Sequence, residues 1–339
     1  MSRFIIEMVD PWKFKDSITG FWLDNIPGTP FERFDWMAQG NPAGPATWLL
    51  AFDSNSKKVA GTISILPREL KVDGKTIRAG ILGDFMVDQK YRVLGPGLGI
   101  LKKATDSISE LNLEFIYTIP NKQSEKLIQH VGFIEVGKIC YLAKPIRIQY
   151  YLDKYAEYLP SRITGSLIEL GIKAFSRETY YPSAGIIEEV GVIDEAFDEI
   201  SDLYAERKCE VAGVRGKEYL TWRYLKNPQY AFRIAVIKDQ HGKARGFTVY
   251  MSGDDYIEIY DIVAQENVVV QNLIKYLAKV ARDAEFKSIY ITVGPMNPMA
   301  GTLKWNLFFD TKFDMRLYAF GNDELMKKEW CFFAGDRNI

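Results

Sequence analysis

An arginine and three glycines lie close together in the segment RVLGPGLG, residues 92–99. An apolar stretch, residues 85–87, precedes this segment, and leucine and isoleucine recur at helical spacing after it. Glycines allow consecutive main-chain N–H groups to turn toward one anion, and a helix N-terminus adds a partial positive charge. The segment therefore predicts a phosphate-binding turn between a buried strand and a helix.

One carboxylate, Asp84, lies in the same apolar strand, between Leu82 and Phe85. Burying an unpaired carboxylate is costly, and burial raises the pKa of a carboxyl group toward the range useful for a general base. Asp84 is therefore a candidate general base. The alternative is that Asp84 anchors a neighbouring loop or arginine, and the sequence leaves both interpretations open.

The composition excludes some classes of protein. Lys and Arg number 43 against 44 Asp and Glu, so there is no basic surplus of the kind that nucleic acids or anionic membranes attract. The three cysteines are far apart and no Cys/His cluster predicts a metal site. Scattered thiols are typical of a reducing cytoplasm, and no apolar run is long enough for a signal peptide or a membrane span. We expect a cytoplasmic protein without a nucleic-acid, membrane or metal partner; the sequence does not indicate its oligomeric state.

The residues before the glycine segment alternate as strands. The stretches WLLAFD and VAGTISIL form one predicted hairpin, and Asp73-Gly74, which both tolerate positive φ, predicts a second. The last strand of this meander leads into the glycine segment. Beyond the following helix, we expect a strand over residues 115–119 and a helix over residues 123–130 that ends at Gly132.

At 339 residues the chain is long enough for two domains, and its second half repeats the first. Trp36 is followed by Asn-Pro at the same distance as Trp222, and a strand hairpin comes after each motif. Further matches pair Gly61 with Gly246 and Asn121 with Asn297. We expect one domain over residues 1–145 and a related one over residues 186–339.

The intervening residues 146–185 are expected to form a helical connector. Three tyrosines share one helical face there, Tyr151, Tyr155 and Tyr158. Such a stripe is the ordinary way for a helix to bury a face between domains. The alternative is a tyrosine-rich lid over an acceptor site.

The order of elements in the first half resembles the GNAT (Gcn5-related N-acetyltransferase) superfamily over roughly residues 48–143. The most specific match is R-x-x-G-x-G at residues 92–97, and the second is Asn121 followed by a helix and Gly132-Phe133. The resemblance implies an α/β (α+β) fold of two tandem GNAT-like domains, each a mixed, mostly antiparallel sheet flanked by helices.

The resemblance also implies an acetyl-CoA site. Main-chain amides of the glycine segment would hold the CoA pyrophosphate, two strand residues would pair with the pantetheine arm, and Asn121 with Ser124 would lie near the thioester. The catalytic residues would be Asp84 and Asn121. The cofactor-binding residues would be Met86, Val87, Arg92, Val93, Leu94, Gly95, Pro96, Gly97, Asn121 and Ser124.

The sequence departs from the superfamily in two places. Many members carry a tyrosine four residues before the Gly-Phe pair, as the acid for the leaving thiolate, and here that residue is Ile128. His130 is interpreted as a solvated helix residue. In the second half, the turn that corresponds to the glycine segment is QENVVVQN, whose β-branched residues cannot readily form a phosphate nest. We therefore expect the second domain to be degenerate, and Asp261 in it favours a structural role for Asp84.

Three functions agree with these features. The first is an acetyl-CoA-dependent N-acyltransferase that modifies an amine of a small-molecule acceptor. The second is a Fem-like aminoacyltransferase, for which the near-neutral charge and the CoA-type turn are unfavourable. The third is a non-catalytic acyl-CoA-binding module, which Ile128 leaves open. No motif identifies the acceptor, because acceptor sites lie on variable loops.

Overall fold

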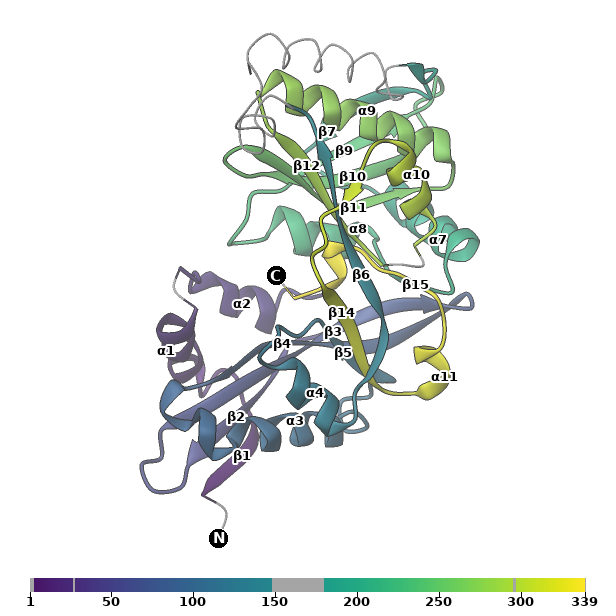
Figure 1. The fold of residues 1–339 in the computed structure, drawn as a ribbon. Coiled ribbons are helices and arrows are strands. Elements are labelled where there is room, and N and C mark those ends of the chain that lie inside the picture. Colours follow the sequence, from purple (N-terminus) through teal and green to yellow (C-terminus); the bar gives the residue numbers. More distant parts are fainter. Residues whose placement is uncertain (1–2, 27, 148–179, 295–296, 339) are drawn as a thin grey trace.

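The computed structural model describes residues 3–26, 28–147, 180–294 and 297–338 (Figure 1). Most of the predicted connector, residues 148–179 with its three tyrosines, lies outside the described residues. In the first half the elements are β1 (Phe4–Val9), α1 (Lys15–Asn25), α2 (Glu32–Ala38), β2 (Thr47–Asp53), β3 (Val59–Val72), β4 (Lys75–Val87), a 3-10 turn (Gln89–Leu94), α3 (Pro96–Asp106), β5 (Phe115–Thr118), α4 (Glu125–Val131) and β6 (Ile134–Pro145).

The second half begins at residue 186 with a strand. Its elements are β7 (Ile186–Val190), α7 (Ala196–Lys208), β8 (Val211–Gly213), α8 (Lys217–Leu220), a π turn (Thr221–Leu225), β9 (Arg233–Lys238), β10 (Ala244–Ser252), β11 (Tyr256–Ala264), α9 (Asn267–Asp283), β12 (Ser288–Val293), α10 (Met299–Trp305), β13 (Phe309–Asp310), β14 (Met315–Gly321), α11 (Asp323–Met326), β15 (Trp330–Cys331) and a 3-10 turn (Ala334–Asp336).

The strands form one continuous sheet in the order β1-β2-β3-β4-β5-β14-β6-β12-β11-β10-β9-β7. Most neighbours are antiparallel, and β4–β5 and β11–β12 are parallel pairs. The expected mixed, mostly antiparallel sheet flanked by helices is therefore confirmed. The hairpin turn at Asp73-Gly74 is also confirmed, since both residues have positive φ.

The two halves exchange strands at the centre of this sheet. β14 comes from the second half but lies between β5 and β6 of the first (Figure 1). β6 is long enough to serve both sides, because residues 134–139 pair with β14 and residues 140–145 pair with β12. The first part of the sheet is therefore completed by residues close to the end of the sequence. The boundaries at 145 and 186 stay a prediction.

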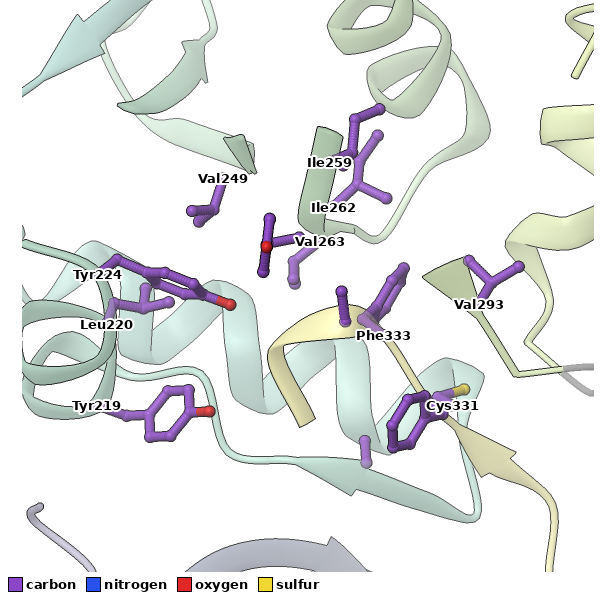
Figure 2. Close-up of a cluster of buried hydrophobic side chains, with 14 of the residues drawn as sticks. Tyr219, Leu220, Tyr224, Val249, Ile259, Ile262, Val263, Val293, Cys331 and Phe333 are labelled. Atoms are coloured by element: carbon purple, nitrogen blue, oxygen red, sulfur yellow. The ribbon is translucent and has the colours of Figure 1, made fainter. Parts of the chain in front are cut away.

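The apolar face of each helix packs on this sheet. In the first half, Ile100, Leu101 and Ala104 of α3 are buried in one cluster with Leu49 and Ile63 of β2 and β3. The core of the second half contains α9 and residues 330–334, and Figure 2 shows Cys331 and Phe333 of this segment grouped with Tyr224 and Val263. Within the described residues no helix combines the length and the apolar character that crossing a membrane requires.

The cysteines differ from the expectation of scattered thiols. Cys209, at the end of α7, and Cys331, in β15, form a disulfide with a Cα–Cα distance of 5.6 Å, which leaves Cys140 as the free thiol. The two cysteines are 122 residues apart in sequence, so no local pattern announces their pairing. The disulfide fixes the start of the segment that runs on to Asn338.

Candidate active site

The two parallel strands β4 and β5 separate after a short paired stretch. Their register joins Ala79 to Phe115 and Ile81 to Tyr117, and no later pair follows. The separation coincides with a bulge in β4, where the register with β3 shifts and Asp84 has a φ of 51°. A bulge bends its strand and ends regular pairing. Beyond Ile81, the edge of β4 that faces away from β3 therefore has no strand partner in the described part of the chain, although the Leu82 carbonyl oxygen accepts from Thr118 Oγ1 at 3.3 Å.

A cavity of about 710 Å³ lies where the strands separate. This volume is within the usual range for small-molecule and cofactor sites. The first half contributes Ile63, residues 81–85 of β4, residues 117–122, Ser124, Glu125 and Ile128. The second half contributes Tyr230, Tyr260, residues 313–316, Arg337 and Asn338. The cavity is thus built between the two halves.

The glycine segment forms the turn that the sequence predicts. Gly95 has a φ of 88°, a left-handed conformation that favours glycine, and it is the N-cap of α3. No side chain caps the helix, and Pro96 occupies its first turn. The N–H groups of the first turn have no partner within a helix, so those of Gly97 and Leu98 are available to an anion.

Two glycines of the segment lie in closely packed places. A Cβ atom at Gly97 would lie 3.2 Å from Phe85 Cζ and 3.2 Å from Leu127 Cδ2, and one at Gly99 would lie 2.3 Å from Ile6 Cδ1. Gly99 therefore serves the contact between α3 and β1. Since Phe85 lines the cavity and also touches Gly97, the helix N-terminus and the cavity are neighbours.

The other predicted cofactor residues lie around this turn. Arg92 is exposed and its Nε donates to the Val87 carbonyl oxygen at 3.2 Å. Val93 and Leu94 belong to the 3-10 turn that precedes Gly95. Met86 and Val87 pair with Thr62 and Gly61 of β3 and do not line the cavity. The main chain of this end of β4 therefore pairs with a strand on one edge only, and the Val87 carbonyl oxygen is held by Arg92.

Asn121 and Ser124 both line the cavity and shape the start of α4. The Asn121 Oδ1 atom accepts hydrogen bonds from the main-chain N–H groups of Gln123, at 3.0 Å, and Ser124, at 2.9 Å. The Asn121 Nδ2 group has no partner among the described residues and can donate to a ligand. The Ser124 hydroxyl donates to Asn121, so the two side chains act as one unit.

The contacts of Asp84 are those expected if it anchors a neighbouring arginine, the alternative to a role as general base. Its carboxylate forms an ion pair with Arg33 of α2 at 2.9 Å and accepts hydrogen bonds from Ser64 and Asn338. Its side chain is 4% exposed. In the second half, Asp261 is also buried and pairs with an arginine, Arg215, at 2.7 Å. A catalytic role for Asp84 stays a prediction.

Ile128 lies where the sequence places it, buried in the cavity wall one turn after Ser124. His130 is exposed and does not line the cavity, as the solvated interpretation predicts. Tyr117 does line the cavity, but its hydroxyl donates to the Asp336 carbonyl oxygen at 2.8 Å. Burial raises the pKa of Tyr117 well above its usual value, so this hydroxyl is a poor proton donor.

The equivalent place in the second half is closed. Glu266 is the N-cap of α9, at the place of Gly95 in the first half, and its carboxylate forms an ion pair with Arg245. β11 and β12 pair over residues 256–259, and beyond them Phe333 bridges to Val293 while the Gly294 N–H donates to the Phe332 carbonyl oxygen. Residues 332–333 thus pair with the strand edge that would line a second cleft.

A role for the second domain as a wall of the acceptor pocket is an expectation from the sequence, but the sequence did not identify the residues that form that wall. Arg316 and Arg337 reach the cavity because β14 joins the first part of the sheet and residues 330–338 return toward it. Glu125 and Tyr318 were also missed. Nothing in the spacing of these residues indicates that they meet residues of β4 and α4.

No protein-family profile matches the sequence, and no curated protein does. Solved structures do match. A GCN5-related N-acetyltransferase from Anabaena variabilis is 14% identical with a TM-score of 0.66, and the match covers 96% of this chain and 74% of that one. The corresponding enzyme from Kribbella flavida is 14% identical with a TM-score of 0.61, covering 94% and 71%. Saccharomyces cerevisiae N-myristoyltransferase with bound myristoyl-CoA is 14% identical with a TM-score of 0.62, covering 95% and 79%.

At 14% sequence identity, the structural similarity to these proteins shows the fold of this chain and nothing more. The chain has the fold of the GCN5-related N-acetyltransferases, as its glycine segment and element order predict.

Proposed function

We propose that the protein is an acyl-CoA-dependent N-acyltransferase, with acetyl-CoA as the acyl donor. The observation that carries the proposal is the cavity at the separation of β4 and β5, next to the uncapped N-terminus of α3. An acyl-CoA needs an anion site for its pyrophosphate and a groove beside it for its pantetheine arm. The first half offers both within one contiguous region.

Each part of the donor would contact residues that suit its chemistry. The N–H groups of Gly97 and Leu98 would hold the pyrophosphate together with the turn from Arg92 to Pro96. The open edge of β4 at Met86 and Val87 would pair with the amides of the pantetheine arm, as an added strand does. Asn121 and Ser124 would contact the arm from the opposite side, through the free Nδ2 group of Asn121.

When bound, the thioester supplies an acyl carbon that an amine nitrogen can attack. The protein must then exclude water, orient the carbonyl group and accept a proton from the amine. The bulge at Asp84 orients the main chain of β4 toward the cavity, so its N–H groups can donate to the carbonyl oxygen. The wall from the second half would hold the acceptor, which we propose to be a small amine.

Ile128 supports a second candidate function, a module that binds acyl-CoA without transferring the acyl group. An isoleucine can neither donate nor accept a proton, and it stands in the wall beside Asn121 and Ser124. The second half would then be a scaffold.

Thiol release separates these two functions. Purified protein is incubated with acetyl-CoA and either glucosamine, spermidine, lysine methyl ester or a glycine-terminated peptide, and free CoA thiol is measured. A transferase releases thiol at a rate that depends on one of the amines. A binding module retains affinity for acetyl-CoA and releases no thiol above the rate without protein.

A further inference from the structure

Among the described residues, three carboxylate side chains line the cavity, those of Asp84, Glu125 and Asp314. A general base needs an oxygen that is free to accept a proton and that faces the substrate. The three carboxylates differ in whether an oxygen is free to accept a proton.

The oxygens of Asp84 are fully engaged. Oδ1 accepts from Arg33 Nη2 at 2.9 Å and from Asn338 Nδ2 at 3.2 Å, while Oδ2 accepts from Arg33 Nη1 and Ser64 Oγ, both at 3.1 Å. Taking up a proton would disrupt a buried ion pair, which is costly. The Asp84 carboxylate therefore holds α2 and Asn338 against β4.

Asp314 lies at the rim of the cavity. Its side chain is 49% exposed and lies 3.6 Å from Arg316 and 3.7 Å from Lys138. Exposed ion pairs of this length are screened by water and held weakly. A carboxylate in this setting has no fixed orientation toward a substrate.

Glu125 combines a fixed oxygen with a free one. It is the first residue of α4, next to Ser124, and its side chain is 31% exposed. Oε1 accepts a hydrogen bond from the Tyr318 hydroxyl at 2.8 Å, and the Tyr318 hydroxyl in turn accepts from Gln129 Nε2 at 2.8 Å. Oε2 has no partner among the described residues.

The surroundings of Glu125 fix the orientation of its carboxyl group. Tyr318 is buried in β14, and burial, followed by its hydrogen bond to Glu125, raises the pKa of its hydroxyl, so that it remains a donor. Arg316 Nε, on the same strand, lies 3.9 Å from Glu125 Oε1, an exposed contact that is weak in the same way as that of Asp314. β14, a strand of the second half, thus orients the Glu125 carboxylate of the first half through Tyr318.

We propose that Glu125 is the general base of the acyl transfer and that Tyr318 is its positioning residue. As the amine nitrogen bonds to the acyl carbon, the carbon–sulfur bond breaks and its electron pair leaves with sulfur. One proton passes from nitrogen to Glu125 and from there to the CoA thiolate, so no other reactant is consumed. This assignment rests on the proposed function and gives Ile128 no part in proton transfer.

The test compares E125Q, Y318F and D84N with a control, E135Q. Glu135 contacts the same Arg316, at 2.9 Å, but does not line the cavity. With acetyl-CoA and the amines named above, kcat of E125Q should fall about 100-fold. Its affinity for acetyl-CoA, measured by calorimetry, should stay within about twofold of wild type. Y318F should lower kcat and leave that affinity unchanged, and E135Q should change neither.

The contact itself is measured without acyl-CoA. Urea unfolding of E125A, Y318F and the double variant forms a cycle in which the two losses of stability should be less than additive, because each single change removes the hydrogen bond between residues 125 and 318. Full additivity would contradict the positioning role of Tyr318.

The slow hydrolysis of acetyl-CoA serves as a second activity, in which water replaces the amine and needs the same base. A rate of E125Q within twofold of wild type in both reactions would overturn the role of Glu125, and loss in D84N alone, in protein that urea unfolding and calorimetry show to be folded and to bind acetyl-CoA, would return that role to Asp84. A wild-type protein that binds no acetyl-CoA, or binds it and releases no thiol in either reaction, would instead contradict the proposed transferase, and this inference with it.

Discussion

Trp36 and Trp222 stack face to face, with ring centroids 4.6 Å apart, and each donates its indole N–H to the main-chain carbonyl oxygen of the other, at 2.8 and 2.9 Å. A reciprocal contact of this kind is what two copies of one surface make around a two-fold axis. The two tryptophans also match each other in the sequence repeat, each followed by Asn-Pro at the same distance. We propose that the halves arose by duplication and meet at this pair.

Replacing either tryptophan should destabilise the protein. In W36F and W222F the partner's carbonyl oxygen loses its buried donor, and a smaller ring fills the same space. We expect a loss of about 1–3 kcal/mol in the free energy of unfolding for each variant, measured in urea. Trp305 is 56% exposed and serves as the control, so W305F should change stability by less than about 0.5 kcal/mol. Equal losses of unfolding free energy in W36F, W222F and W305F would contradict a special contribution of the Trp36–Trp222 contact to stability.

Arg33 and Asp84 form a buried ion pair, and breaking it from one side should be costly. D84N leaves the Arg33 guanidinium buried with a neutral partner, so we expect about 3–5 kcal/mol of destabilisation. The control is D35N, because Asp35 pairs with Lys15 at the surface, where such pairs contribute little. If D84N is as stable as D35N, then Asp84 is not the anchor that its contacts indicate.

The disulfide between Cys209 and Cys331 predicts one free thiol in the unreduced, denatured protein, that of Cys140. Titration with a thiol reagent should count one before reduction and three after it. Because the bond closes a loop across 122 residues of sequence, reduction should lower the free energy of unfolding by about 4 kcal/mol. Three thiols before reduction would show that the disulfide does not form.

Glu258 should make stability depend on pH. Burial raises the pKa of its carboxyl group, and Arg337, 3.7 Å away, offsets only part of that effect. The folded protein therefore binds this proton more tightly than the unfolded chain does. Its contribution to stability is present below the ordinary glutamate pKa, near 4.3, and is lost as pH rises through the raised folded value.

Removing the charge of the Glu258 carboxylate should stabilise the folded protein at neutral pH. E258Q should melt at a higher temperature than wild type at pH 7.5, and the difference should shrink at pH 4.5. The control, E114Q, changes an exposed glutamate and should show no such trend. A difference that grows as pH falls would contradict the direction of the shift.

The sequence predicts those parts of the fold and site that local chemistry determines. Alternation, the Asp73-Gly74 turn and the glycines of residues 92–99 announce the meander, the strand and the start of α3, because each reflects the conformation of a few neighbouring residues. Asn121 and Gly132 likewise mark the two ends of α4.

Non-local contacts could not be predicted in this way. β14 pairs with β5 across 200 to 206 residues of sequence, as in the pairs Tyr318–Thr118 and Gly321–Phe115, and the sequence of β14 itself is typical of an ordinary strand. The orientation of Glu125 depends on Tyr318 of that strand, and the contacts of Asp84 depend on Arg33 and Asn338. A carboxylate in an apolar strand predicts a partner but does not identify it.

Binding of acetyl-CoA tests the central claim most directly. Calorimetry is performed on wild type, on G97D and on a control, G301D, which places the same charge in the first turn of α10, where a new Cβ meets no atom within 4 Å. The proposed site predicts one acetyl-CoA per chain for wild type and G301D. In G97D binding should weaken at least tenfold, because the carboxylate occupies the anion site. No binding by wild type, or equal binding by all three proteins, would contradict the assignment of this site.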